Sequence, residues 1–229
     1  MRNQRNEAQD YVRQQDWSSA LPLLLELLDS GENDIELHHL TGFCYKYMGQ
    51  LDLAINAFKR AVVLAAELPD SEFKAQQYNA LGVSYQNNEA YEKAIQTLLE
   101  GIKIFSDIFS MHNSLGITYK LNAEPDKALI AFLDARDIAL SNAFESCDVK
   151  NIDGEKLSAA DNEKISLKLR STSDWCTVMS NIGMNLLRAG NIDHAENALK
   201  ESVDFIPSGF DYPGPQHALD YIYSIRKED

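Results

Sequence analysis

Small and apolar residues recur along the chain in a fixed order. A Gly or Ala is followed by a Tyr or Leu three positions later, an Ala twelve positions later, and a Leu or Phe sixteen positions later. Five such sets begin at Ala8, Gly42, Gly82, Gly116 and Gly183. The sets that begin at Gly82 and Gly116 are 34 residues apart. A repeat of this length is typical of an array of helical hairpins.

Each position of the pattern suits two antiparallel helices in close contact. The residues three positions on are Tyr11, Tyr45, Tyr85, Tyr119 and Leu186. Those twelve positions on are Ala20, Ala54, Ala94, Ala128 and Ala195. Those sixteen positions on are Leu24, Phe58, Leu98, Phe132 and Leu199. The small residues allow two backbones to approach, and we expect the bulky sixteenth residue to close onto the neighbouring hairpin.

Short polar turns separate the two helices of each predicted hairpin. Gly49 and Gly190 are suited to end a helix because glycine tolerates left-handed backbone geometry. Pro125 is suited to the first position of a helix, where its missing amide hydrogen is not needed. The predicted hairpins span residues 1–34, 35–68, 75–108, 109–141 and 176–208.

The pattern resembles that of the tetratricopeptide repeat family, whose motif has a Leu-Gly pair, Tyr, Ala, Phe, Ala and a closing Pro. The resemblance covers nearly the whole chain, although Glu7-Ala8 replaces Leu-Gly in the first repeat and Pro207 is the one closing proline in register. It implies an all-α fold: a right-handed superhelix of five hairpins that forms a single domain over residues 1–229. We expect a capping helix over 215–227, where Leu219, Ile222, Tyr223 and Ile225 would cover the fifth repeat.

Two interruptions break the period. About six extra residues near 64–72 predict an extended helix that ends at Pro69. A longer insertion spans residues 141–173. Within it, Asp153-Gly154 is a turn signal, and the alternation of Ile165, Leu167 and Leu169 is typical of a short strand. We therefore expect a loop or lid with some local order; the alternative is a helix that leads into Trp175.

Composition narrows the possible partners. The chain has a formal charge of -14, which argues against general binding of nucleic acid or anionic membranes. Its three cysteines predict no disulfide framework, and a reducing compartment is the simpler interpretation. The first ten residues are polar and do not form a secretory signal. The longest apolar run, 21–28, is too short to cross a bilayer. These features predict a cytoplasmic protein without membrane insertion.

No pattern in the sequence predicts catalysis. Phosphate-binding glycine loops, nucleophile elbows and zinc-protease motifs are absent from the sequence. His38 and His39 are adjacent, so on a helix they point about 100° apart and cannot share a metal ion. We expect neither a metal site nor a cofactor, and no enzymatic activity.

The exposed face of each first helix carries the candidate binding residues. In tetratricopeptide proteins, the corresponding face lines a concave groove. The candidate partner-binding residues on this face are His39, Phe43, Lys46, Tyr47, Asn79, Val83, Gln86, Asn113, Ile117, Lys120, Met184 and Arg188.

These side chains suit a peptide ligand. Asn79 and Asn113 can donate and accept hydrogen bonds along an extended backbone. The apolar row would hold apolar side chains, and Lys46 and Lys120 would favour carboxylates. A purely structural role, with the apolar row supporting packing and the lysines in solvent, stays open. The family's clamp of Lys, Asn and Arg for a chaperone tail does not carry over, because its places are taken by His39-Leu40, Gln76 and Ala80.

We therefore expect a non-catalytic module that binds an extended or helical segment of a partner protein in the groove. Self-association is also possible, and one alternative is a self-assembling scaffold that recruits clients. A bacterial secretion chaperone is another. A third is an enzyme or sensory domain with a small-molecule site under the insertion.

Overall fold

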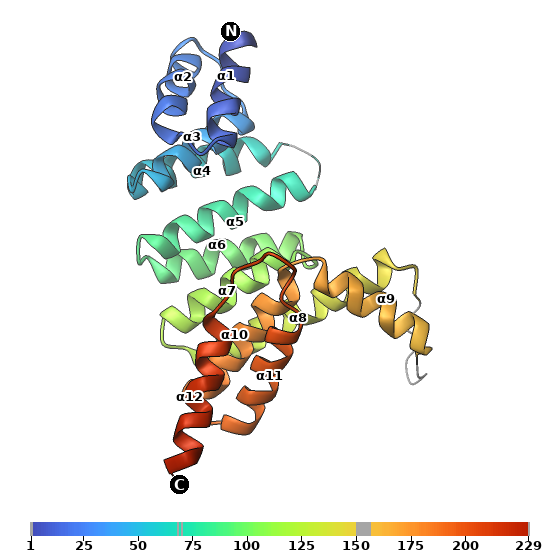
Figure 1. Ribbon diagram of the computed structural model, residues 1–229. Coiled ribbons are helices and arrows are strands. Elements are labelled where there is room, and N and C mark those ends of the chain that lie inside the picture. Colours follow the sequence, from blue (N-terminus) through green and yellow to red (C-terminus); the bar gives the residue numbers. More distant parts are fainter. Residues whose placement is uncertain (1, 68, 70, 150–156, 229) are drawn as a thin grey trace. The chain divides into compact units, whose positions relative to one another are not determined.

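The computed structural model describes residues 2–67, 69, 71–149 and 157–228. Over these ranges every regular element is an α-helix, as predicted (Figure 1). The contacts divide the chain into two compact units, residues 1–106 and 107–229, here called the N-terminal and C-terminal units. The prediction of one solenoid domain over the whole chain stays a prediction, and each unit is described by itself.

Three helical hairpins form the N-terminal unit. Its helices are α1 (Arg2–Arg13), α2 (Trp17–Asp29), α3 (Ile35–Tyr47), α4 (Leu51–Ala65), α5 (Glu72–Asn87) and α6 (Tyr91–Ile104). Each odd-numbered helix packs on the helix that follows it, and α2 packs on α3 as α4 packs on α5. The extension near residues 64–72 differs from the prediction, because α4 ends at Ala65 rather than at Pro69.

The C-terminal unit contains two further hairpins, an insertion and a capping helix. Its helices are α7 (Phe109–Leu121), α8 (Pro125–Ser146), α9 (Ala159–Arg170), α10 (Asp174–Arg188), α11 (Ile192–Asp204) and α12 (Gly214–Glu228). The pairs α7–α8 and α10–α11 form the hairpins, and α10 also packs on α8. Leu219 and Ile222 of α12 are buried against Leu199 of α11, as expected of a cap. Tyr223 stays 37% exposed.

The repeated small residue is the contact point of each hairpin. A methyl group added at Gly116 would lie 2.5 Å from two ring carbons of Phe132, and one at Gly82 would lie 2.6 Å from Leu98. The bulky sixteenth residue thus packs on the small residue of its own hairpin, a contact that the sequence analysis missed. It also joins the next hairpin as predicted, since Phe58 shares a buried cluster with Leu81.

The turns follow the prediction at three positions. Gly49 and Gly190 have φ angles of 75° and 77°, in the left-handed region. Pro125 is the first residue of α8. In the corresponding turns of the third and fourth hairpins, Glu89 and Ala123 take the same left-handed geometry without glycine, at φ angles of 56° and 58°. The turn shape is therefore set by the hairpin and not by glycine alone.

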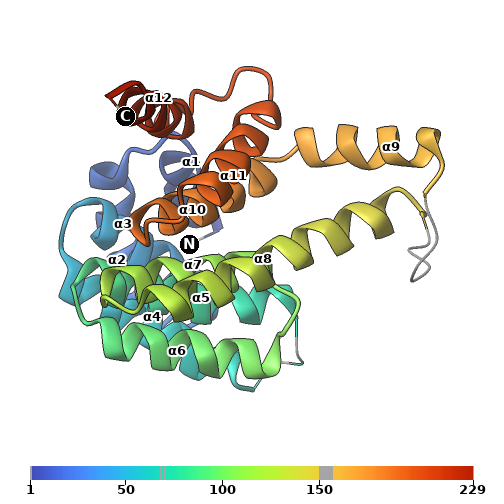
Figure 2. The same cartoon turned by 90° about the horizontal axis from the view of Figure 1, so that it is seen from below.

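The insertion is helical where the sequence analysis expected a loop or lid with a short strand, and α9 agrees better with the alternative of a helix that leads into Trp175. Helix α8 continues for 22 residues to Ser146, and α9 packs back along it (Figure 2). Ile165 and Leu169 lie one helical turn apart and are buried, whereas Leu167 between them is 61% exposed. The apolar residues at 165, 167 and 169 therefore alternate with polar ones in sequence but do not form a strand. The predicted turn at Asp153-Gly154 lies outside the described residues. We call α9 and the end of α8 from residue 139 the arm.

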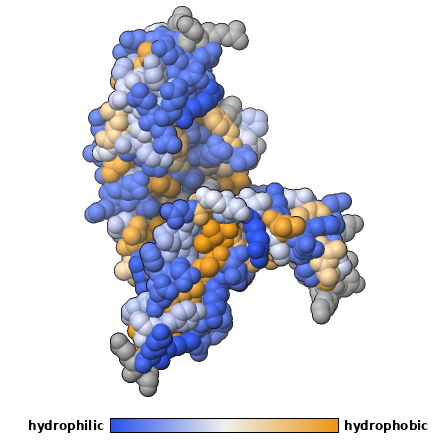
Figure 3. All heavy atoms as spheres, in the orientation of Figure 1, coloured by the Kyte–Doolittle hydropathy of each residue, from blue (hydrophilic) through white to orange (hydrophobic). Residues whose placement is uncertain are grey.

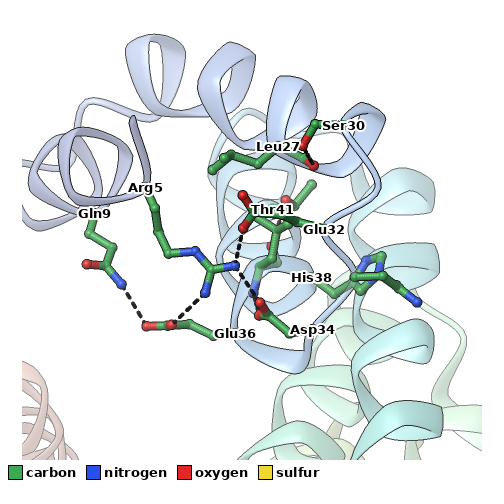
Figure 4. Close-up of polar contacts among 11 residues, drawn as sticks. Arg5, Gln9, Leu27, Ser30, Glu32, Asp34, Glu36, His38 and Thr41 are labelled. Atoms are coloured by element: carbon green, nitrogen blue, oxygen red, sulfur yellow. Dashed lines mark hydrogen bonds and ion pairs between the residues drawn. The ribbon is translucent and has the colours of Figure 1, made fainter. Parts of the chain in front are cut away.

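Arg5 ties the first helix to the start of α3. Its guanidinium forms ion pairs with Glu32, at 2.7 Å, and with Asp34, and it lies 3.8 Å from Glu36 (Figure 4). Asp34 also accepts a hydrogen bond from the backbone amide of Leu37 and so caps α3. Burial raises the pKa of Asp34, but the Leu37 amide and the Arg5 guanidinium outweigh it and bring the pKa below its ordinary 3.8.

Replacing Arg5 with methionine is expected to lower the free energy of unfolding of the N-terminal unit by about 1 kcal/mol at neutral pH, because partly exposed ion pairs are weakened by solvent. Folding lowers the pKa of Asp34, so this stabilisation is present above 3.8 and is lost as the pH falls through the folded-state pKa. Urea unfolding should thus show a difference between wild type and variant that shrinks towards about pH 2.5. Arg13→Met is the control, because Arg13 is exposed and its one ion pair within the described residues is with Asp10 of its own helix. An equal loss of stability from Arg13→Met would contradict the assignment.

Candidate partner-binding face

A hollow of about 190 Å³ lies between α3 and α5 in the N-terminal unit. Its wall combines rings and aliphatic groups with one ammonium group, one imidazole and two amides. The lining residues are His39, Phe43 and Lys46 from α3, and Gln76, Asn79, Ala80 and Val83 from α5. Five of these were predicted from the sequence. Because α3 and α5 are the first helices of adjacent hairpins, the hollow lies on the face that the helical wheel selected.

His39 is held in one tautomer by α5. Its Nδ1 atom lies 2.7 Å from Oε1 of Gln77, and Nε2 of Gln77 donates to the carbonyl oxygen of Phe73 at 2.8 Å. A carbonyl only accepts, so this bond fixes the orientation of the Gln77 amide. His39 Nδ1 must then be the donor, and in the neutral ring Nε2 carries no proton. Burial lowers the pKa of His39, which favours this neutral ring.

Lys46 places its ammonium group beside aromatic rings. Nζ lies 5.6 Å from the ring centre of Phe43 and 5.3 Å from that of Tyr47. Burial lowers the pKa of Lys46. Among the described residues no carboxylate forms an ion pair with it. Tyr47 does not line the hollow; its ring stacks on Trp17 of α2, with centroids 4.4 Å apart. Lys46 is thus a half-buried cation supported by rings alone.

Asn79 contributes an acceptor that nothing satisfies within the described part of the chain. Its Oδ1 atom is buried and has no hydrogen-bond partner there. The sequence analysis did not select Gln76 and Ala80 for binding, although the helical period could have found them. They lie three residues before Asn79 and three before Val83, on the same side of α5.

In the C-terminal unit, the predicted residues lie on α7 and α10. Oδ1 of Asn113 accepts a hydrogen bond from Nδ2 of Asn181 at 3.0 Å, so this amide already has a partner. Ile117 packs against the core of that unit, and Met184 packs against the cluster under α12. The pKa of Lys120 is lowered by burial and also by the positive charge of nearby Arg188. Several of these groups therefore support packing between hairpins as well as facing outward.

The remaining predicted residue, Gln86, belongs to α5 and does not line the hollow. Elsewhere in the described ranges, no cluster of three or more His, Cys, Asp or Glu residues could hold a metal ion. No helix in those ranges has the length and apolarity needed to cross a membrane.

Comparisons with known proteins agree with the hairpin geometry. A family model described as "Tetratricopeptide repeat" matches residues 35–67 and 75–107, the second and third hairpins. No curated protein sequence matches. A solved structure of MamA from Desulfovibrio magneticus RS-1 is similar, with a TM-score of 0.64 and 16% identity over 89% of this chain and 93% of that one.

Two other solved structures are also similar. BtubC from P. vanneervenii has a TM-score of 0.64 at 19% identity, over 86% of this chain and 76% of that one. YrrB, described as "a TPR protein with an unusual peptide-binding site", has a TM-score of 0.56 at 15% identity, over 93% of this chain and 88% of that one. At such identities the likeness concerns the fold.

The family model and the structure thus lead to one assignment. The two matched hairpins place a bulky side chain on their glycine, at Gly42 and Gly82, and the fourth and fifth hairpins repeat this packing at Gly116 and Gly183. The described elements are α-helices throughout, arranged as in repeat proteins of this type. The chain therefore contains tetratricopeptide repeats at residues 35–67 and 75–107, within an all-helical fold like that of solved tetratricopeptide repeat proteins.

Proposed function

We propose that this protein is a non-catalytic interaction module that binds a segment of a partner protein across α3 and α5. The hollow between these two helices carries the proposal. It joins apolar walls at Phe43 and Val83 to polar groups with unused hydrogen-bonding or charge capacity at Lys46 and Asn79. Binding sites commonly combine apolar walls with a few convergent polar groups. The peptide-binding site named for YrrB agrees with such a use of the fold.

The site is tested with two matched variants that place a carboxylate inside and outside the hollow. Val83 lines the hollow, whereas Val63 on α4 is 60% exposed and does not. Val83→Glu fills the hollow and adds negative charge, so we expect it to abolish partner capture. Val63→Glu makes the same exchange in the same unit and should leave capture unchanged.

The measurement is quantitative proximity labelling followed by mass spectrometry in the source cells. Circular dichroism should show that both variants are folded. A partner that is retained by Val63→Glu and lost by Val83→Glu supports the site. Equal capture by both variants would contradict it and would direct attention to the arm.

A further inference from the structure

We propose that the hollow between α3 and α5 receives an apolar side chain of the partner together with a carboxylate two residues away in sequence. Lys46 binds the carboxylate. When the His39 ring is protonated, its Nε2–H also donates to this carboxylate. This inference rests on the proposed function and specifies the chemistry of the ligand at that site.

The charge preference follows from Lys46. Its ammonium group is partly removed from water and has no carboxylate partner among the described residues. Contacts with ring faces recover only part of the lost hydration. A chain with 35 acidic residues and 21 basic ones has abundant carboxylates for pairing. In this concave site, however, the described partners of Lys46 are aromatic rings. This environment favours an anionic ligand and disfavours a basic one.

The apolar part of the ligand follows from the walls. Phe43, Ala80 and Val83 surround a space with room for one side chain of Leu or Phe size. The Phe43 ring is itself braced edge-on by His39, with centroids 4.8 Å apart, and by Phe58 at 5.5 Å. The wall is therefore preorganised, which lowers the entropy lost when a ligand side chain is bound.

The amides favour an extended backbone between these two side chains. Oδ1 of Asn79 is a buried acceptor without a partner among the described atoms, and a ligand backbone N–H would satisfy it. Gln76, one turn earlier on α5, can accept and donate at the same wall. An acidic residue two positions from an apolar one fits this arrangement, because alternate side chains of an extended segment point to the same side.

His39 makes the site sensitive to pH. With its Nδ1 proton committed to Gln77, protonation adds the second proton at Nε2 and turns an acceptor into a charged donor. On α3, the negative charge of Glu36 acts on the His39 ring, and the ammonium group of Lys46 lines the same hollow. Helix α4 presents the ring of Phe58, and α5 presents the ring of Phe73 and the Gln77 amide. A bound carboxylate stabilises the protonated ring, so affinity should increase as the pH falls.

The test uses the full 15N-labelled chain and three blocked peptides: Gly-Glu-Gly-Phe-Gly-Glu-Gly, a version with Gln for Glu, and a version with Ala for Phe. Binding is followed through the side-chain amide signals of Gln76 and Asn79. We expect the peptide with Glu and Phe to bind about tenfold more tightly at about pH 5.5 than at about pH 7.5, since one unit of pKa shift corresponds to a factor of ten. Its carboxylates stay ionised at both pH values. The Ala peptide should bind about tenfold more weakly than this peptide at both pH values. The Gln peptide lacks the carboxylates, so it should bind about tenfold more weakly at about pH 7.5 and about a hundredfold more weakly at about pH 5.5.

Three variants separate the contributions. At about pH 7.5, where His39 is neutral, Lys46→Met should remove the preference for Glu over Gln. His39→Gln should remove the pH dependence. Lys103→Met makes the same exchange at an exposed position on α6 and should keep both. Equal binding of the Glu and Gln peptides to wild type would overturn the proposal that the ligand contributes a carboxylate. An affinity that does not change with pH would overturn the role of His39. If no peptide binds, the ligand chemistry is wrong, whereas the proposed function is decided by the Val83→Glu experiment.

Discussion

Replacing Gly116 with alanine is expected to lower the free energy of unfolding of the C-terminal unit by about 3 kcal/mol. The added methyl group would lie 2.5 Å from two carbons of the Phe132 ring, and Phe132 is completely buried. The ring cannot retreat without displacing residues such as Val178 and Ile182 in the same cluster. Tightly packed cores respond to such overpacking with strain and backbone movement.

The two tryptophans make this loss measurable in one unit. Trp17 belongs to α2 and Trp175 to α10. In a Trp17→Phe background, denaturant unfolding followed by tryptophan fluorescence reports on the C-terminal unit. Gly214→Ala is the control, because the same methyl group would meet no atom within 4 Å there. If Gly116→Ala is as stable as Gly214→Ala, the close contact between α7 and α8 does not exist as described.

Replacing Trp175 with alanine is expected to cost about 4 kcal/mol, because the indole is large and almost fully buried. It belongs to the cluster that joins α10 to Ile165 and Leu169 of the arm. Its Nε1 atom donates to Oε1 of Glu201 on α11 at 3.1 Å, so the same side chain also ties the fifth hairpin together. Losing the indole should loosen both the arm and the fifth hairpin, and amide hydrogen exchange in α9 should become faster than in wild type.

Trp175→Phe separates packing from hydrogen bonding. A phenylalanine keeps an aromatic ring in the cluster and loses the donor to Glu201, so we expect a loss of about 1 kcal/mol. Urea unfolding followed by circular dichroism measures both variants. A phenylalanine variant as unstable as the alanine variant would show that the hydrogen bond to Glu201, and not the buried ring, carries the stabilisation.

The hairpins could be predicted from the sequence because each depends on local spacing. Gly82 and Leu98 are sixteen residues apart, and this distance follows from one helix, a short turn and a return helix. The sequence analysis nevertheless missed that the bulky residue packs on its own glycine. Both residues were identified, but spacing alone does not show which of two neighbouring backbones a side chain touches.

The insertion was predicted less well for a physical reason. Over five residues, apolar groups at Ile165, Leu167 and Leu169 fit a strand as well as a helix with one exposed residue. The length of α8 was missed as well, because the repeat period was taken to end the fourth hairpin near residue 141. Residues 126–146 contain neither Gly nor Pro, so nothing in this sequence stops the helix at that point.

The binding face was also predicted only in part. The helical period selected His39, Phe43, Lys46, Asn79 and Val83, and the structure brings these five residues together around one hollow. The hydrogen bond between His39 and Gln77 was not predictable, since it joins two helices 38 residues apart in sequence. Asn113, chosen by the same rule as Asn79, instead contacts Asn181 of the next repeat.

The unbroken course of α8 has a mechanical consequence. Its 22 residues make a rod of about 33 Å. Near one end Phe132 is packed on Gly116, and near the other Ala143 lies in the cluster with α9. A helix without an internal break resists bending, so a load applied at the tip of the arm acts as a torque on the fourth hairpin. The arm is therefore a lever that extends from the part of α8 on which α7 and α10 pack.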